Sequence, residues 1–340
     1  MSSTPTSRSY PFATANAFSQ DAFGGNPAII VFLDRSNTLT QEERLKFAKG
    51  LNQPVVVFLT STPVADNGLG VVSFDIQYFS PTEEVELCGH GTVAATKIIL
   101  DSAINLPGLR QESWFPAFPS SDIHTVEFIT GNGMVISARK VVIPSEGGGE
   151  EEYWFEIDLP AGKLEKLPTE EEQRVLSIFA RAVGKEPKVE YIGMGQPPLE
   201  RDLLIVLDES ESIEKLKLDA KVLVSKAQVQ DPHFNGFTYI KMQKSTGFEK
   251  NIVTTDSTSG KFPEDYIVRV FCPAVGIEED QVCGSANCTM GPYWAAKKGI
   301  TELRVRQVSE RGGKLRVVVD GENIKLGGQV KVTGVGQFFL

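Results

Sequence analysis

The sequence is poor in the residues that most often bind metals or form disulfide bonds. Its 340 residues include 4 cysteines and 3 histidines, and no Cys-x-x-Cys pair occurs. Four cysteines in a chain of this length do not make a disulfide framework. A structural zinc site needs paired ligands two to four residues apart. We therefore expect neither a disulfide scaffold nor a metal.

Long apolar runs and an excess of basic charge are also missing. The longest uninterrupted apolar run, Pro27 to Leu33, is too short to cross a bilayer. The N-terminal residues lack the apolar core of a secretory signal. Lys and Arg number 34 against 44 Asp and Glu, a formal net charge of −10, so the surface repels phosphate backbones and anionic lipids. We expect a cytoplasmic protein with no nucleic-acid and no membrane partner.

What the sequence does contain is enough apolar residues for two compact units with similar strand and helix patterns. A helix is expected from Thr40, where a capping box is present, to Gly50. A second helix is expected from the capping box at Thr169 to Gly184. The expected strands are 27–34, 55–59, 71–79, 153–159, 203–207, 237–242, 267–271, 314–319 and 329–333.

One phrase occurs twice, once in each half. Phe79–Pro81 is followed after six residues by Cys88–Gly91, and Phe271–Pro273 is followed after nine residues by Cys283–Ala286. Each copy follows a β-rich run and precedes small, helix-compatible residues. The repetition in matching context indicates an internal duplication and a site shared by the two halves.

A cysteine followed by glycine at a helix start has a specific chemistry. The first N–H groups of a helix have no intrahelical partner, and the helix dipole adds partial positive charge there. The pKa of Cys88 and Cys283 is therefore expected to fall toward neutrality, and the same N–H groups would hold a carboxylate. Two such thiols facing one substrate suit a racemase or epimerase, because one removes a proton and the other returns one to the opposite face.

Other interpretations of these residues stay open. Buried cysteines often behave as small hydrophobes, and this is the interpretation we keep for Cys272 and Cys288. His90 is either a general acid or carboxylate ligand, or a ring that only caps the helix start. Asp280 lies in an acidic loop, where most charges are merely solvated.

Several segments together resemble the signatures of the phenazine-biosynthesis F-type (PhzF-like) isomerases. They are Asp21–Ala28, Phe79–Thr82, Glu84-Val85, Cys88–Thr92, Gly276–Asp280 and Gly284–Ala286. This family shares its fold with diaminopimelate epimerase and proline racemase. The resemblance implies an α/β (α+β) fold of two pseudo-symmetric domains, each a curved, mostly antiparallel sheet around a central helix, and no cofactor. It places the domains at residues 1–140 and 141–324, with the strand in 325–340 returning to the first.

Two positions depart from the PhzF-like pattern. These isomerases carry a catalytic glutamate in a segment resembling Asn-x-x-Glu-x-x-Phe, and aligning Asn52 and Phe58 with it puts Val55 at the glutamate position. A valine cannot shuttle protons. Where many PhzF-like proteins have Thr-Gly-Ser-Ala, this chain has Cys283–Ala286, which together with Cys88 restores the cysteine pair of the epimerase and racemase relatives.

By this resemblance, Cys88 and Cys283 are the acid/base pair of a cofactor-independent epimerase or racemase that acts next to the carboxylate of an amino acid or small metabolite. The expected substrate contacts are Asn26, Gly89, His90, Gly91, Asp280, Gly284, Ser285 and Ala286. Two rival functions remain: a PhzF-like double-bond isomerase acting through His90 and Asp280, and a non-catalytic protein that binds a small molecule. We expect a homodimer, because dimers are common among the relatives.

Overall fold

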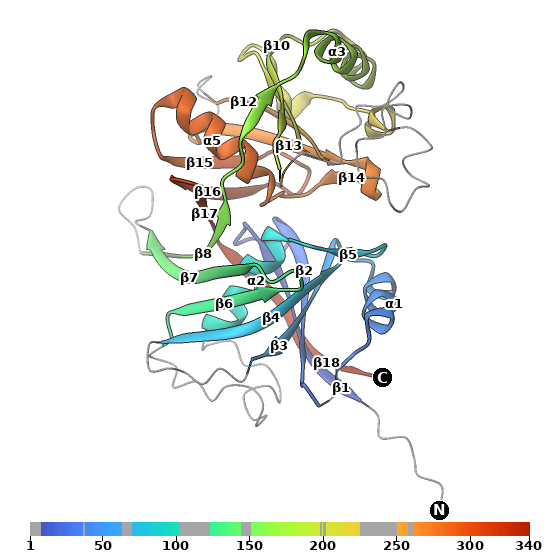
Figure 1. The fold of residues 1–340 in the computed structure, drawn as a ribbon, viewed down its shortest axis with the longest axis vertical. Helices are drawn as coiled ribbons and strands as arrows, with labels where there is room; N and C mark the ends of the chain where they lie inside the picture. The colour runs from blue at the N-terminus through green and yellow to red at the C-terminus, as the bar shows by residue number, and fades with distance from the viewer. Residues whose placement is uncertain are drawn as a thin grey trace, which may run out of the picture. The chain divides into compact units, whose positions relative to one another are not determined.

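The computed structural model describes residues 8–36, 38–62, 70–101, 123–143, 151–197, 199, 202–224, 250–257 and 262–340. The chain forms two compact units, shown in Figure 1. The N-terminal unit comprises Met1–Asp158 and Gly327–Leu340, and the C-terminal unit comprises Leu159–Leu326. The strand expected over 237–242 lies outside the described residues.

The N-terminal unit is a mixed sheet that curves around one helix (Figure 1). Its strands are β1 (Ser9–Ala17), β2 (Asn26–Leu33), β3 (Val55–Ser61), β4 (Val71–Phe79), β5 (Glu84–Val85), β6 (Thr125–Thr130), β7 (Val135–Ile143), β8 (Glu152–Pro160) and β18 (Val330–Phe339). They pair in the order β18-β1-β2-β3-β4-β6-β7-β8, with β5 also on β4. Helix α2 (Gly89–Leu100) contacts β1, β2, β3, β6, β7 and β18. It can lie inside the sheet because its residues are small or apolar, and most of them are buried.

The C-terminal unit repeats this arrangement. Its strands are β9 (Leu164–Lys166), β10 (Val189–Gly195), β11 (Asp202–Leu207), β12 (Lys250–Asp256), β13 (Tyr266–Cys272), β14 (Ile277–Asp280), β15 (Glu302–Gln307), β16 (Gly313–Asp320) and β17 (Asn323–Gly328), whose last residues belong to the N-terminal unit. In the N-terminal unit β2–β3 and β4–β6 are parallel; here β11–β12 and β13–β15 are parallel. Helix α5 (Ala286–Lys298) contacts β11, β15 and β16. The matching order of parallel and antiparallel pairs supports the internal duplication.

A second helix covers the other face of each sheet. Ala48 of α1 (Gln41–Leu51) packs with Val56 and Phe58 of β3. Val175 and Phe179 of α3 (Thr169–Val183) pack with strand residues of the C-terminal unit in the same way. Because side chains alternate along a strand, the odd-numbered residues of β3 face α2.

The ends of the helices partly match the sequence predictions. The capping box of α1 is confirmed, with the Thr40 side chain accepting from the N–H of Glu43. The C-cap of this helix is Asn52 (φ 49°) rather than the predicted Gly50. Helix α3 ends at Gly184 as predicted. Its predicted capping box is wrong, because Thr169 is already helical and the N-cap is Pro168, which has no side-chain donor or acceptor.

The boundary between the units falls after Asp158, later than the predicted division at residue 140. The reason is β8, which pairs antiparallel with β7 from Ala138↔Ile157 to Ile143↔Glu152 and so continues the first sheet. At the other end of the chain, β18 pairs with β1 along its length, from Ser9↔Phe339 to Ala17↔Val330. The last strand therefore belongs to the N-terminal unit.

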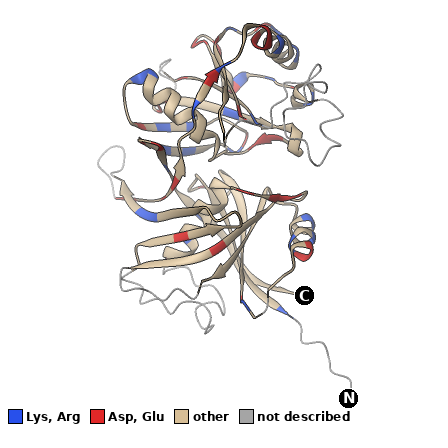
Figure 2. Cartoon of the chain, viewed as in Figure 1, with Lys and Arg blue, Asp and Glu red and all other residues tan. Residues whose placement is uncertain are grey.

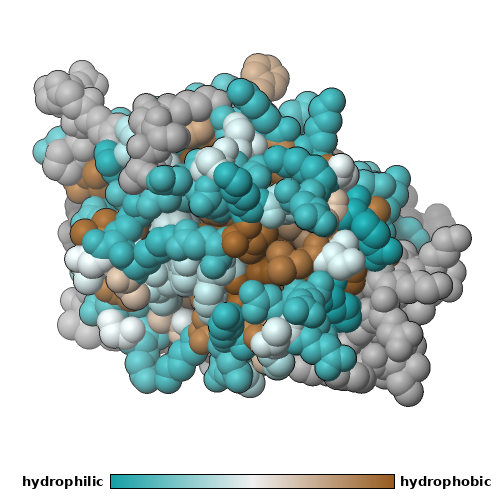
Figure 3. Space-filling view, turned by 90° about the horizontal axis from the view of Figure 1, so that it is seen from above, coloured by the Kyte–Doolittle hydropathy of each residue, from teal (hydrophilic) through white to brown (hydrophobic). Residues whose placement is uncertain are grey.

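Charged side chains of both signs occur on the strands and helices of each unit (Figure 2). The face drawn in Figure 3 is mostly hydrophilic, with an apolar patch in its middle. Within the described residues, no helix is both long and apolar enough to cross a membrane.

Candidate active site

The first cysteine phrase ends on the N-terminus of α2. Cys88 is the N-cap residue (φ −134°, ψ 101°), and the first bond of the helix runs from the N–H of Thr92 to the Cys88 carbonyl at 3.0 Å. The N–H groups of Gly89, His90 and Gly91 therefore have no acceptor within the helix. As predicted, this phrase places a thiol and three such amides at one helix start.

Cys88 belongs to a buried cluster with His90 and Asn26, which begins β2. The Nδ1 atom of His90 lies 3.3 Å from Cys88 Sγ and 3.3 Å from Asn26 Nδ2. An amide nitrogen can only donate, so Nδ1 accepts, and the proton of the neutral ring is on Nε2. The ring also hydrogen-bonds to the backbone of Pro27. His90 thus contacts both the Cys88 thiol and Asn26, which is one of the expected substrate contacts, rather than only capping the helix.

Burial lowers the pKa of His90 to about 4, although the bond to the Pro27 backbone opposes the shift. The imidazole is therefore neutral at physiological pH. Nδ1 has one lone pair, and the Cys88 thiol and the Asn26 amide, each 3.3 Å away, compete for it as hydrogen-bond donors. The Cys88 sulfur therefore lies next to a neutral, weakly basic imidazole.

The lowered pKa of His90 predicts a pH-dependent stability. Between pH 6.5 and about 4 the unfolded chain binds a proton at this residue and the folded chain does not, so stability falls as the pH falls. From pH 7 to pH 5 this residue should cost about 2 kcal/mol of unfolding free energy. Urea denaturation of His90→Gln should show a correspondingly smaller loss over that range. Equal losses in the two proteins would contradict the prediction.

Val55 also lies at this cluster. A Cβ atom placed on Gly91 would lie 3.3 Å from Cys88 Sγ and 3.4 Å from Val55 Cγ1, so both side chains adjoin the same point of the helix start. Val55 is 1% exposed and pairs with Ala28, two residues after Asn26. The position that aligns with the glutamate of the PhzF-like pattern thus adjoins the same helix start as the thiol, and here it carries an apolar side chain.

The second cysteine phrase folds differently from the first. The N-cap of α5 is Ser285, so Cys283 precedes the helix and the expectation that it matches Cys88 as the helix start is wrong by two residues. The N–H of Asn287 bonds to the Gly284 carbonyl at 3.1 Å, and the N–H of Cys288 to that of Ser285 at 3.0 Å. These i→i−3 bonds tighten the first turn.

A glutamine that the sequence did not single out fixes the Cys283 loop. The Oε1 atom of Gln307, on β15, accepts the N–H of Cys283 at 2.9 Å, and its Nε2 atom donates to the Asp280 carbonyl. The side chain of Asp280 accepts the N–H of Val282 at 3.2 Å. Gln307 is 1% exposed and therefore acts as an internal brace between the two ends of the loop.

The pKa of Cys283 is raised well above its usual value, which corrects the expectation of an acidic thiol. Burial is the largest cause, and the charge of Asp280 adds to it. Lys250, the backbone of Ala286 and the hydroxyl of Ser285 act in the opposite direction. The thiol is 4% exposed, and desolvation here outweighs the helix-start effect.

A buried tyrosine braces the cysteine segment in each unit. Tyr78 and Thr92 share a hydroxyl hydrogen bond of 2.7 Å, and Thr92 Oγ1 donates to the Cys88 carbonyl at 2.8 Å. In the C-terminal unit, Tyr266 donates to Asn287 Oδ1 at 2.8 Å, and Asn287 Nδ2 donates to the carbonyl of the second cysteine at 3.0 Å. A buried tyrosine thus supports the cysteine backbone in both units, through Thr92 in one unit and through Asn287 in the other.

The structure brings the expected residues together in two groups, one in each unit. The N-terminal group is Asn26, Cys88, Gly89, His90 and Gly91, and the C-terminal group is Asp280, Cys283, Gly284, Ser285 and Ala286. Over the described ranges, no set of three or more His, Cys, Asp or Glu side chains is placed to hold a metal ion.

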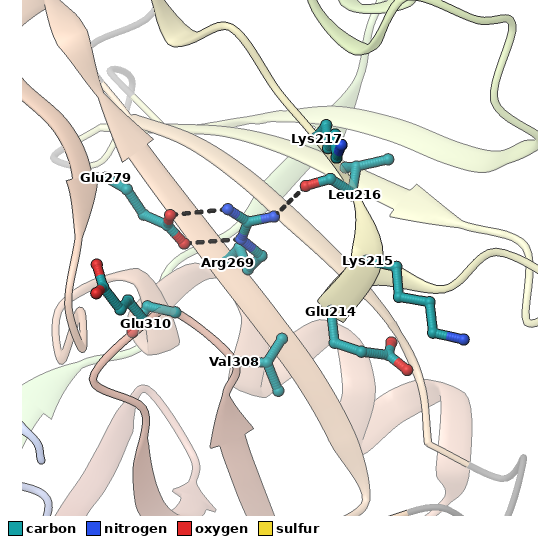
Figure 4. Close-up of a pocket in the computed structure, with 9 residues that line it drawn as sticks. Glu214, Lys215, Leu216, Lys217, Arg269, Glu279, Val308 and Glu310 are labelled. Carbon is teal, nitrogen blue, oxygen red and sulfur yellow. Dashed lines mark hydrogen bonds and ion pairs between the residues drawn. The ribbon is translucent and has the colours of Figure 1, made fainter.

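A charged pocket of about 690 Å³ lies elsewhere in the C-terminal unit (Figure 4). Its main feature is Arg269, which binds Glu279 with two hydrogen bonds of 2.7 and 2.8 Å and also donates to the Leu216 carbonyl. Glu279 lines this pocket, whereas Asp280, the next residue of β14, points to the other face of the strand. Ser309, which also lines the pocket, donates to the Gln281 carbonyl, so the pocket borders the back of the Cys283 loop.

A curved sheet around a central helix, present twice and each time with a cysteine beside the helix start, defines a protein of the epimerase-like fold class. The chain belongs to the PhzC-PhzF family of phenazine biosynthesis-like proteins, whose profile matches residues 15–339. The predicted fold class and family are confirmed.

Individual relatives agree with this assignment. The chain is 28% identical over 319 residues to a protein named as an uncharacterized isomerase of Halalkalibacterium halodurans, with 94% of each chain covered. The crystal structure of a PhzF-family phenazine biosynthesis protein from Enterococcus faecalis superposes with a TM-score of 0.69 at 25% identity, covering 98% of this chain and 100% of that one. A hydroxyproline epimerase from Agrobacterium vitis shares the fold, with a TM-score of 0.50 at 10% identity and coverage of 98% and 93%. Family and fold together support an isomerase.

Proposed function

We propose that this protein is a cofactor-independent isomerase that inverts a carbon next to a carboxylate, with Cys88 and Cys283 as its acid/base pair. The observation that carries the proposal is the Cys88 thiol on the N-cap of α2, 3.3 Å from the neutral Nδ1 of His90, with Val55 where a glutamate would otherwise stand. With an apolar residue at position 55, the groups that can transfer a proton at this helix start are the Cys88 thiol and the His90 imidazole, and we assign the transfer to the thiol. The proposal requires both sulfur atoms to reach one substrate carbon.

The helix start supplies the anchor for the substrate. The N–H groups of Gly89, His90 and Gly91 bind the carboxylate, as anions bind at helix N-termini. One sulfur, as thiolate, takes the proton from the neighbouring carbon, and the other thiol gives a proton to the opposite face, so the count of protons is unchanged. Burial and Asp280 oppose ionisation of Cys283. An ammonium group on the substrate would favour it, since an opposite charge stabilises the thiolate. Amino acids are therefore the preferred substrate class.

The test is incubation with a panel of amino acids in deuterated water. We expect deuterium to enter at the α-carbon of at least one amino acid, together with inversion, and both to depend on the cysteines. A panel in which no member exchanges in a cysteine-dependent manner would count heavily against the proposal and leave the two rival functions.

Replacing Cys283 by threonine separates the proposal from double-bond isomerisation through His90 and Asp280. Threonine occupies this position in many PhzF-like proteins, so the rival mechanism predicts that Cys283→Thr is tolerated. The two-cysteine mechanism predicts a loss of inversion of about 10²-fold, the contribution typical of one acid or base. Chiral chromatography of the product measures the effect.

A further inference from the structure

Cys283 does not take its position from a helix or a strand. Strand β14 ends at Asp280 and helix α5 begins at Ala286, so this thiol lies on the connection between them. Cys88 differs, because its carbonyl accepts the first bond of α2. The Cys283 carbonyl instead accepts from the side chain of Asn287 at 3.0 Å. The place of the second thiol is therefore set by side-chain bonds.

Side chains at the C-terminal end of β15 supply the other bonds. Gln307 is the last residue of β15, and it pairs with both neighbouring strands, β13 and β16. Its side chain binds the N–H of Cys283 and the Asp280 carbonyl. Two residues later, the hydroxyl of Ser309 donates to the Gln281 carbonyl. Two side chains from one edge thus hold three backbone groups of the loop that carries the thiol.

Only a carboxamide can make both bonds of Gln307. The N–H of Cys283 needs an acceptor and the Asp280 carbonyl needs a donor, so Oε1 faces the first and Nε2 the second. A leucine side chain offers neither group, and a glutamate carboxylate offers only acceptors. Because Gln307 is 1% exposed, a lost bond leaves a buried polar group without a partner, which is costly.

We propose that Gln307 is a positioning residue for proton transfer: by holding the Asp280 carbonyl and the Cys283 N–H, it fixes where the second thiol lies. The inference rests on the proposed function and deepens it. Proton transfer at carbon requires the sulfur to be held within about 0.5 Å of its productive position. The helix start does this for Cys88, whereas the Gln307 side chain does it for Cys283.

The first test is iodoacetamide labelling of Cys283 in Gln307→Leu without substrate. Cys283 is 4% exposed, so the reagent reaches the thiol when the loop opens locally. Loss of both bonds should make labelling about tenfold faster, measured by peptide mass spectrometry. Cys288 is 0% exposed within α5 and should stay unlabelled, since its labelling requires the helix to unfold. The matched control is Gln196→Leu, which removes a glutamine that binds Glu165 rather than the loop and should leave labelling unchanged.

The second test, Gln307→Glu, makes the same brace depend on pH. The protonated acid accepts from the Cys283 N–H and donates to the Asp280 carbonyl, as glutamine does, whereas the carboxylate cannot donate. Burial raises the pKa of such a carboxyl, so the change should fall between about pH 5 and about pH 8. Relative to the unaltered protein, inversion should be near normal at the acidic end and about 10²-fold slower at the alkaline end, mainly in kcat. A general loss of stability would not reverse on acidification.

Two results overturn the inference. One is labelling of Cys283 in Gln307→Leu at the rate of the unaltered protein, and the other is a relative inversion rate of Gln307→Glu that does not change with pH. Gln307→Glu at acidic pH, where both bonds are restored, keeps the test valid if Gln307→Leu unfolds and exposes Cys288. Faster labelling in a protein that exchanges no α-proton with deuterium rejects the proposed function and leaves Gln307 as the residue that fixes the loop.

Discussion

Cys88→Ala is expected to lower the rate of inversion about 10⁴-fold while leaving a one-sided exchange reaction. Without the Cys88 sulfur no group returns a proton to one face of the carbon, so inversion stops. The Cys283 thiol remains and still exchanges the α-proton of the enantiomer whose C–H bond faces it. Deuterium incorporation into each enantiomer, measured separately by mass spectrometry and chiral separation, distinguishes the two effects.

The matched control for this prediction is Cys288→Ala. Cys288 is fully buried within α5, and burial raises the pKa of its thiol to about 12, so it is inert as an acid or base. Alanine suits a helix interior, and the variant should keep the rate of inversion. Loss of exchange for both enantiomers in Cys88→Ala, or retention of inversion, would refute the two-cysteine mechanism.

Gly91→Ala should lower kcat/KM about 10²-fold and destabilise the fold by about 2 kcal/mol. The added Cβ would meet Val57 Cγ2 at 2.8 Å and Cys88 Sγ at 3.3 Å. Val57 is β-branched and 0% exposed, so it has little freedom to move aside. The first turn of α2 must then shift, and with it the thiol. Steady-state kinetics and urea denaturation measure the two losses.

Gly50→Ala is the matched control for Gly91→Ala. Gly50 is exposed in α1, and a Cβ there meets nothing within 4 Å among the described atoms. Alanine in place of glycine within a helix should stabilise it by about 0.5 kcal/mol and leave activity unchanged. Equal stability of the two variants would show that the close approach at Gly91 has no consequence.

Strands with clear alternation could be predicted from the sequence, and strands built from small residues could not. The range 71–79 was predicted to the residue as β4. Strand β1 was missed because its inward residues are mostly alanines, which carry little strand signal but let α2 lie close. The end of β18 was missed because Gly334 and Gly336 are typical of loops. A Cβ at Gly336 would meet Phe12 at 2.8 Å, so the ring of the partner strand takes the space that a side chain would fill.

In the candidate site, too, residues marked by a local sequence pattern could be predicted, and residues that reach the site from distant parts of the sequence could not. The repeated phrase singles out Cys88, His90 and Cys283 as candidates, because the helix starts are encoded next to them. Gln307 and Lys250 act on Cys283 from strands that are distant in sequence, and no local pattern marks them. The direction of the thiol pKa was misjudged for this reason: it depends on burial and on charges that only the folded chain brings near.

The different partners of the two thiols have a kinetic consequence. A catalyst leaves the ratio of two mirror-image molecules at equilibrium unchanged, so kcat/KM for the forward and reverse directions must be equal for a true racemase. Under the proposed two-cysteine mechanism, neutral His90 lies beside Cys88, whereas burial and the charge of Asp280 raise the pKa of Cys283, so the two enantiomers need not bind with equal affinity. We therefore expect the maximal velocity to differ between the two enantiomers, with the Michaelis constants differing by the same factor so that kcat/KM is equal.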